Sequence, residues 1–353
     1  MPEFVPCYYP FTTLNIGPGG DVWFCCPEWT VDPGATRLGN VMHSPLTDIW
    51  NNERARAIRR AMYANDVGGW CRIRGCPILN GNTRISMDGI KSQFRGDLFH
   101  GSTVRAIRDD NDMLDGFPSH LIISNDWRCN LCCVMCETTL HAASKSPHQE
   151  VAAVTDRIFD ELERNVDSVK RIFFSGYGEP LAIKCHLRYM QHTTRNHPHL
   201  EIELLTNGLL LTPEMWETIK HNRLATIRVS VDATTREIYE KIRKGGNWEA
   251  LLRNLRFLGA LRRSGEIPGF EINMTVMRDN YWQVYDFLRF GEEFSCDCMG
   301  LQIIKGTLGN QNFLEPTVDW SIVEFLQEFL RSETARHPHY YVEFLRHLED
   351  MRR

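Results

Sequence analysis

The stretch "HLIISNDWRCNLCCVMC", residues 120–136, decides the fold because a short apolar run leads directly into four closely spaced cysteines. Residues 120–126 have the composition of a buried strand. The thiols at 129, 132, 133 and 136 then offer two triplets, C-x3-C-x2-C or C-x2-C-x3-C. Soft thiolates select zinc or iron–sulfur clusters, and a structural zinc site wants a fourth ligand that is missing nearby. The stretch therefore predicts a strand followed by a metal site with an open coordination position.

Further strand-like runs follow, and helix-like segments lie between them. The strands are expected at 169–176, 201–208, 226–232, 270–277 and 299–305, and the helices at 150–166, 213–222, 235–244, 247–263 and 280–290. Thr212, followed by Pro213, is a plausible helix start. Strands that alternate with helices predict an α/β fold whose parallel sheet is either open or curled into a partial (β/α)6 barrel. In such folds the reactive groups gather at the carboxyl ends of the strands.

The chain is expected to have four regions. Residues 1–80, rich in Gly, Pro and Trp, read as a small, irregular, Cys-rich α+β module with one amphipathic helix near 52–63. A segment this irregular would struggle to bury a core alone, so a metal staple is a natural explanation. Residues 81–118 read as a polar connector, 119–310 as the partial barrel and 311–353 as C-terminal helices.

Composition excludes several classes of protein. The chain has 40 Lys and Arg against 45 Asp and Glu, a net charge of −5 without a basic block, so no nucleic acid partner is expected. No apolar run approaches the length of a membrane span, and the N-terminus does not resemble a signal peptide, so we expect a cytoplasmic protein without a membrane partner. In a reducing compartment, the 12 cysteines are more plausibly metal ligands or catalytic groups than disulfides.

The spacing C-x3-C-x2-C after a first strand, with Met135 before the last cysteine, resembles the radical S-adenosylmethionine (SAM) superfamily. In that family three cysteines hold a [4Fe–4S] cluster that binds SAM and cleaves it reductively, which gives a 5′-deoxyadenosyl radical that abstracts hydrogen from the substrate. The resemblance selects Cys129, Cys133 and Cys136 and leaves Cys132 as an extra thiol. It implies an enzyme with SAM as cofactor and an electron donor such as flavodoxin or ferredoxin.

Later strand ends resemble the same family. "SGYGEP" (175–180) is similar to its Gly-Gly-Glu-Pro element, "TNG" (206–208) closes the third strand, and "SVDATTREIYEKIRKGG" (230–246) follows the fourth. The resemblance places Ser230 and Arg243 near the SAM carboxylate, and it places residues of the last two strands, including Gln302 to Ile304, beside the nucleoside. The positions assigned to SAM in this way are Met135, Gly176, Tyr177, Gly178, Glu179, Pro180, Asn207, Ser230, Asp232, Arg243, Asn273, Val276 and Ile303.

The N-terminal cysteines form a second pattern. Cys7, Gly20 and Cys25 give C-x12-G-x4-C, and Cys71 and Cys76 follow after "GNVMHSPLTDIWNN". This resembles the SPASM/twitch module, although the family's module usually follows the barrel. The resemblance implies that Cys7, Cys25, Cys71 and Cys76 hold one auxiliary [4Fe–4S] cluster. By bare spacing a zinc site with four cysteine ligands fits equally well, and Cys26 is the alternative to Cys25.

The reaction and the substrate are less sharply indicated. Cys296 and Cys298, just before the sixth strand, are candidate hydrogen-atom donors, or else small loop hydrophobes. The module leaves no room in 1–118 for a peptide-recognition domain. We therefore expect epimerisation, decarboxylation or oxidation of a small polar carbohydrate- or nucleoside-type metabolite in specialised metabolism. The alternatives are a radical SAM maturase of a ribosomally made peptide and a non-catalytic metal-binding protein.

Overall fold

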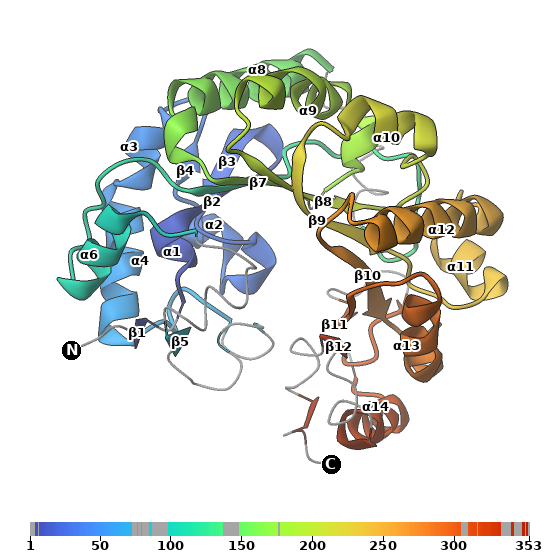
Figure 1. Cartoon of the computed structure of the whole chain (residues 1–353). Helices are drawn as coiled ribbons and strands as arrows, with labels where there is room; N and C mark the ends of the chain where they lie inside the picture. The colour runs from blue at the N-terminus through green and yellow to red at the C-terminus, as the bar shows by residue number, and fades with distance from the viewer. Residues whose placement is uncertain are drawn as a thin grey trace. The chain divides into compact units, whose positions relative to one another are not determined.

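Strands alternate with helices from His120 to Ile303, as the sequence predicts. The structure is a computed structural model (Figure 1). It describes residues 4–5, 7–72, 76, 79, 85–86, 98–136, 148–175, 177–304, 310–315, 317–332, 340–341, 348–349 and 351. The chain divides into two units. The first comprises Met1–Trp127, Lys145–Tyr177 and Arg188–Ile202, and the second comprises Arg128–Ser144, Gly178–Leu187 and Glu203–Arg353.

The sheet of the first unit has the strand order β7-β6-β2-β3-β4. The strand β6 (His120–Ile123) pairs in parallel with β7 (Arg171–Phe174) on one side and with β2 (Thr13–Ile16) on the other. The strand β3 (Asp21–Trp23) is antiparallel to β2, and β4 (Gly39–Asn40) is antiparallel to β3. All of β2 is buried, so its sequence "TLNI" lacks the alternation that marks a half-buried strand. The predicted α+β module thus contributes a strand to the parallel sheet, which the sequence did not predict.

Short helices fill the rest of the first unit. The amphipathic helix expected near 52–63 is α4 (Glu53–Ala64), and the Asn52 side chain caps it by accepting a hydrogen bond from Ala55 N at 2.9 Å. Part of the predicted connector forms α6 (Gly101–Arg108), and β1 (Phe4–Val5) pairs with β5 (Ile85–Ser86). The other helices are α1 (Tyr9–Thr12), α2 (Pro33–Thr36), α3 (Leu46–Trp50) and α8 (His148–Arg164).

The second unit has the strand order β12-β11-β10-β9-β8. The strand β10 (Phe270–Val276) is parallel to both β9 (Arg223–Ser230) and β11 (Cys298–Ile303), which is followed by β12 (Tyr340–Tyr341). The division between the units falls within β8 (Glu201–Thr206). Residues of β10 alternate between buried and half-buried, and helices α12 (Trp248–Ser264) and α13 (Val284–Glu293) contact this strand (Figure 1). The half-buried face is therefore free for polar groups.

The helix predictions of the second unit are confirmed. Thr212 caps α10 (Pro213–Ile219) by accepting a hydrogen bond from Met215 N at 3.3 Å. The helices α11 (Arg236–Ile242), α12 and α13 lie within the expected segments to within a few residues, and α9 (Lys184–Asn196) precedes β8. Of the C-terminal helices, α14 (Trp320–Ser332) is present, while 333–339 and 342–347 lie outside the described residues.

All six strands expected from 120 to 305 are present, which confirms the α/β fold with a parallel sheet. The boundaries proposed at residues 80, 118 and 310 stay predictions. Within the described part of the chain, no helix is long and apolar enough to cross a membrane.

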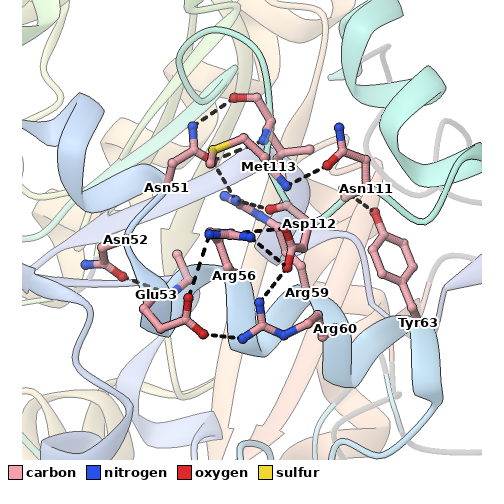
Figure 2. Close-up of polar contacts among 12 residues, drawn as sticks. Asn51, Asn52, Glu53, Arg56, Arg59, Arg60, Tyr63, Asn111, Asp112 and Met113 are labelled. Atoms are coloured by element: carbon pink, nitrogen blue, oxygen red, sulfur yellow. Dashed lines mark hydrogen bonds and ion pairs between the residues drawn. The ribbon is translucent and has the colours of Figure 1, made fainter.

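The buried side chain of Arg59 joins α4 to segments that precede and follow this helix in the sequence. Arg59 donates hydrogen bonds to Asn51 Oδ1 at 2.8 Å and Asp112 O at 3.0 Å (Figure 2). It also donates to Pro10 O at 2.8 Å and Trp50 O at 2.6 Å. Its guanidinium also lies 4.3 Å from the centre of the Trp50 ring. Burial lowers the pKa of Arg59 to about 9, against the opposing effect of Asp112. Pro10 follows Cys7 in the chain, so Arg59 also fixes the start of the cysteine module.

Candidate active site with two cysteine clusters

The cysteine loop after β6 is held by backbone hydrogen bonds within the second unit. Arg128 O accepts from Glu179 N at 2.8 Å, Cys132 N donates to Lys244 O at 2.9 Å, and Val134 N donates to Ile242 O at 2.9 Å. These bonds tie residues 128–134 to the turn after β7 and to the end of α11. The loop is therefore positioned by the "GEP" and "KIRKGG" segments, whose resemblance to SAM-binding elements the sequence indicates.

Three of the four thiols in this loop act on one another electrostatically. Burial raises the pKa of Cys133 to about 12, and Cys136 and Cys129 add to the rise. Desolvation by the surrounding protein, with a contribution from Cys136, also raises the pKa of Cys129 even though that side chain reaches solvent. Cys133 is buried, whereas Cys132 is exposed. Negative charge on several thiolates here needs a cation, which a metal cluster supplies.

A buried ion pair lies beside this triplet. Arg243 Nη2 lies 2.6 Å from Asp232 Oδ2, and Arg243 Nη1 lies 3.9 Å from Cys133 Sγ. Burial lowers the pKa of Arg243, but the charges of Asp232 and Cys133 outweigh it and raise the pKa above its ordinary value. Asp232 Oδ1 also accepts from Thr275 N at 2.6 Å. The arginine therefore stays charged, and its neighbours are Asp232 and the cysteine loop.

Glu179 joins the second and third strand ends. Its Oε1 accepts from Thr206 Oγ1 at 2.7 Å and from Leu181 N at 3.1 Å, and its Oε2 accepts from Asn207 N at 2.7 Å. Burial raises the pKa of Glu179, while these hydrogen bonds and Arg243 lower it. Glu179, which the resemblance assigns to SAM, thus already has protein partners, and Thr206 is a residue of this network that was not among the positions assigned to SAM.

Asn207 extends the network to the cysteine loop. Its Nδ2 donates to Asn130 Oδ1 at 2.8 Å and lies 3.9 Å from Cys129 Sγ. Gly208 follows with φ +78°, and a Cβ there would lie 2.7 Å from Val229 Cγ1. A glycine is required at this turn because both its backbone conformation and its close approach to β9 exclude a side chain.

The other predicted SAM contacts lie at different places. Ser230 and Asn273 are paired in the β9–β10 register and are both half-buried. Val276 and Ile303 are also paired, but each is on the buried face of its strand, together with Met274. Strand alternation therefore puts their side chains on a different face from that of Asn273, and their predicted contact with SAM stays a prediction. Gln302, which is paired with Thr275, is half-buried as Asn273 is, and its Nε2 donates a hydrogen bond to Thr275 Oγ1 at 3.2 Å.

The structure describes three further positions that the resemblance assigns to SAM. Met135 is half-buried within the cysteine loop, and Pro180 is buried at the start of the 3-10 helix Pro180–Ala182. Gly178 has φ +76°. Gly176 lies outside the described residues.

The two candidate hydrogen-atom donors lie at the amino end of a strand. Cys298 is the first residue of β11, where it is paired with Glu271, and Cys296 lies in the preceding turn. Burial, with Asp297, raises the pKa of Cys296. The cysteine triplet follows the carboxyl end of β6 instead. The donor role of these two thiols stays a prediction.

The N-terminal thiols form a second electrostatic group, in the first unit. Cys7, Cys25, Cys71 and Cys76 are all buried. Burial, followed by Cys76 and Cys71, raises the pKa of Cys7, and burial with Cys76 raises that of Cys71 to about 12. Burial and the charges of Cys7, Cys26, Cys71 and Cys76 raise the pKa of Cys25. The Cys26 thiol donates to Glu28 Oε2. The four cysteines expected as ligands are therefore neighbours, and Cys26 has another partner.

Within the described residues no three His, Cys, Asp or Glu side chains are close enough together to hold a single metal ion. The donor sets are nevertheless all sulfur. Such sets fit iron–sulfur clusters, whose ligands are cysteine thiolates.

Comparison with known proteins places both groups in matched regions. Residues 128–291 match the radical SAM superfamily, and residues 7–77 match the iron–sulfur cluster-binding SPASM domain. The mycofactocin maturase of Mycobacterium tuberculosis (strain CDC 1551) is 24% identical over 200 residues, which are 56% of this chain and 48% of that protein. The AdoMet-dependent heme synthase of Methanosarcina barkeri is 30% identical over 169 residues, which are 47% of this chain and 44% of that protein.

A solved structure is also among the matches. SuiB of Streptococcus suis, bound to the precursor peptide SuiA, is 15% identical with a TM-score of 0.47, over 84% of this chain and 64% of that one. The chain spans about half the length of the curated relatives described above.

Proposed function

Since the chain is a radical SAM enzyme with an SPASM-type iron–sulfur module, we propose that it modifies a peptide substrate through SAM-dependent hydrogen abstraction. The radical SAM match implies a [4Fe–4S] cluster and SAM as cofactors, and the SPASM match implies an auxiliary iron–sulfur cluster. When bound, the first cluster supplies the one-electron reduction that makes SAM a hydrogen-abstracting agent. A one-electron donor of the flavodoxin or ferredoxin type would be the redox partner.

One observation carries the assignment of ligands. Cys129, Cys133 and Cys136 influence one another's pKa, and Cys133 lies next to the guanidinium of Arg243. These three would hold the SAM cluster, with Cys132 as a bystander. In the N-terminal module, the same argument assigns the auxiliary cluster to Cys7, Cys25, Cys71 and Cys76.

Residues around the triplet would orient SAM. The Asp232–Arg243 pair holds the cysteine loop and keeps a positive charge beside it, which suits a carboxylate ligand. The Tyr239 hydroxyl is buried and has no hydrogen-bond partner among the residues that the structure describes, so it can donate to a bound ligand. Glu179 and Asn207 fix the neighbouring strand ends.

The preference for a peptide rests on the relatives. Several matched proteins are mycofactocin maturases, and a maturase acts on a precursor. Others are named as a heme synthase and a GTP 3′,8-cyclase, which act on different molecules. The carbohydrate- or nucleoside-type metabolite expected from the sequence gains no support beyond the cyclase and stays the second candidate.

The first experiment tests the chemistry without the substrate. Reduced, reconstituted protein should convert SAM to 5′-deoxyadenosine, and Cys133→Ala should abolish this while the adjacent Cys132→Ala should not. Production by Cys133→Ala would refute the ligand assignment. Absence of the nucleoside from wild type with a full iron complement would refute the enzymatic function.

The substrate class needs a separate test. The wild-type enzyme would be incubated with deuterated candidate substrates, namely precursor peptides and nucleotide or sugar metabolites. We expect deuterium to enter 5′-deoxyadenosine from a peptide. Transfer only from a small metabolite would overturn the peptide proposal and leave the chemistry intact.

A further inference from the structure

One carboxylate of the first unit has two partners that come from distant parts of the chain. Tyr177 OH donates to Glu28 Oε1 at 2.6 Å, and the thiol of Cys26 donates to Glu28 Oε2. Tyr177 and Glu28 are 149 positions apart. A hydrogen bond to a carboxylate is stronger than one between neutral groups, so this contact holds both segments in place.

The two segments have different tasks. Glu28 lies in the 3-10 helix Pro27–Trp29, directly after Cys25 and Cys26 of the cysteine module. Tyr177 precedes Gly178 and Glu179, the turn whose backbone and side chain position the other cysteine loop. The Tyr177 hydroxyl therefore points away from its own turn and toward the module.

A contact with a tryptophan ring strengthens the connection. The ring centres of Tyr177 and Trp127 are 4.1 Å apart, and Trp127 lies two residues before Cys129. Tyr177 is thus in contact with the segment that leads into the cysteine triplet as well as with Glu28. Where the related element has a plain glycine, this chain has a side chain that contacts both regions.

We infer that Tyr177 is a positioning residue through which occupation of the auxiliary site controls the affinity for SAM. The inference depends on the proposed cluster ligands. Filling the auxiliary site would order the Cys25 loop, and with it Glu28. The ordered carboxylate then fixes Tyr177 and the turn that carries Glu179. Such coupling between two sites is typically worth about 5- to 150-fold in affinity, and it is reciprocal.

The test is a double-variant cycle on SAM binding. SAM dissociation constants would be measured by anaerobic equilibrium dialysis for wild type and Tyr177→Phe, each with and without Cys7→Ala/Cys76→Ala. These two cysteines are far from Glu28 in the sequence, and iron analysis would verify that the auxiliary cluster is lost and the other retained. Phenylalanine keeps the ring that contacts Trp127 and removes only the hydroxyl. Tyr63→Phe is the matched control, since the Tyr63 hydroxyl bonds to Ala106 O and Asn111 O elsewhere in the first unit.

We expect loss of the auxiliary cluster to weaken SAM binding about tenfold in wild type and in Tyr63→Phe. In Tyr177→Phe the affinity should be low and indifferent to the auxiliary cluster. Persistence of the tenfold effect in Tyr177→Phe, or its absence from wild type, would overturn the inference. Neither result affects the proposed function, which is tested separately by SAM cleavage in the loaded wild-type enzyme and by deuterium transfer from the candidate substrates.

Discussion

Arg243 and Asp232 form an ion pair of 2.6 Å in which both side chains are almost fully buried, at 8% and 1% exposure. Removing one partner of such a pair leaves an uncompensated buried charge. Arg243 also lies beside Cys133. A structural defect caused by its uncompensated charge would therefore extend to the cysteine loop.

We therefore expect Asp232→Asn to lower the free energy of unfolding by about 3–5 kcal/mol and to reduce 5′-deoxyadenosine formation. Chemical denaturation and product analysis measure the two effects. The exposed pair Arg236–Glu249 is the control, and Glu249→Gln should leave both quantities unchanged. Full stability in Asp232→Asn would show that Arg243 finds another counter-ion.

Arg59→Gln should destabilise the first unit by about 3 kcal/mol, because glutamine leaves several buried carbonyls without a donor at about 1 kcal/mol each. The affected acceptors are Pro10 O, Trp50 O and Asp112 O, of which Figure 2 shows Asp112. Denaturant titration of the apoprotein measures the change. Arg60→Gln, one position along α4 and exposed, should behave like wild type. Equal losses in both variants would contradict a special role for Arg59.

We expect the fold to be sensitive to acid because the side chain of His120 is buried. Burial, with the charge of Arg171, lowers its pKa to about 3, so the folded protein does not bind a proton there while the unfolded chain does below about pH 6.5. The unfolded state is favoured as the pH falls from about 6.5 toward 3. Between pH 7.5 and 5.5 the free energy of unfolding should fall by about 1 kcal/mol.

Thermal unfolding of apoprotein at the two pH values checks this. The pH-dependent loss should shrink in His120→Gln, which cannot titrate, and should persist in the exposed His43→Gln. An unchanged pH dependence in His120→Gln would assign the effect to other groups.

Gly208→Ala should impair the turn after β8, since φ is +78° and the new Cβ would lie 2.7 Å from Val229 Cγ1. We expect a loss of about 1–3 kcal/mol from overpacking, with weaker SAM binding because Asn207 is displaced. Gly68→Ala, where a Cβ meets no atom within 4 Å, is the control. A stable Gly208→Ala variant with normal SAM affinity would mean that the turn tolerates a shift.

The strands could be predicted because local patterns specify them. Apolar runs predicted the strands from β6 to β11, whereas the cluster ligands expected from the cysteine motifs stay predictions. Side-chain direction was harder: the strands were located, but not the alternation that puts Val276 and Ile303 on the buried face.

Contacts between distant segments could not be predicted. No sequence pattern near Glu28 predicts its hydrogen bond with Tyr177. No pattern near Glu179 predicts that Thr206 and Asn207 donate hydrogen bonds to its carboxylate. Arg59 reads as one more charge on an amphipathic helix, although its partners lie in three other segments. These interactions depend on tertiary packing, which sequence periodicity does not encode.

The parallel pairing of β2 with β6 has a consequence for how the protein is made. Thr13 and His120 are partners in this ladder but are separated by 107 positions. During synthesis β2 leaves the ribosome long before its partner exists. More than a hundred further residues must therefore be translated before β2, which follows Cys7, can pair with β6. Such non-local pairing slows folding because the loop must close before the contacts form. Cluster assembly in the N-terminal module is thereby tied to a late folding event.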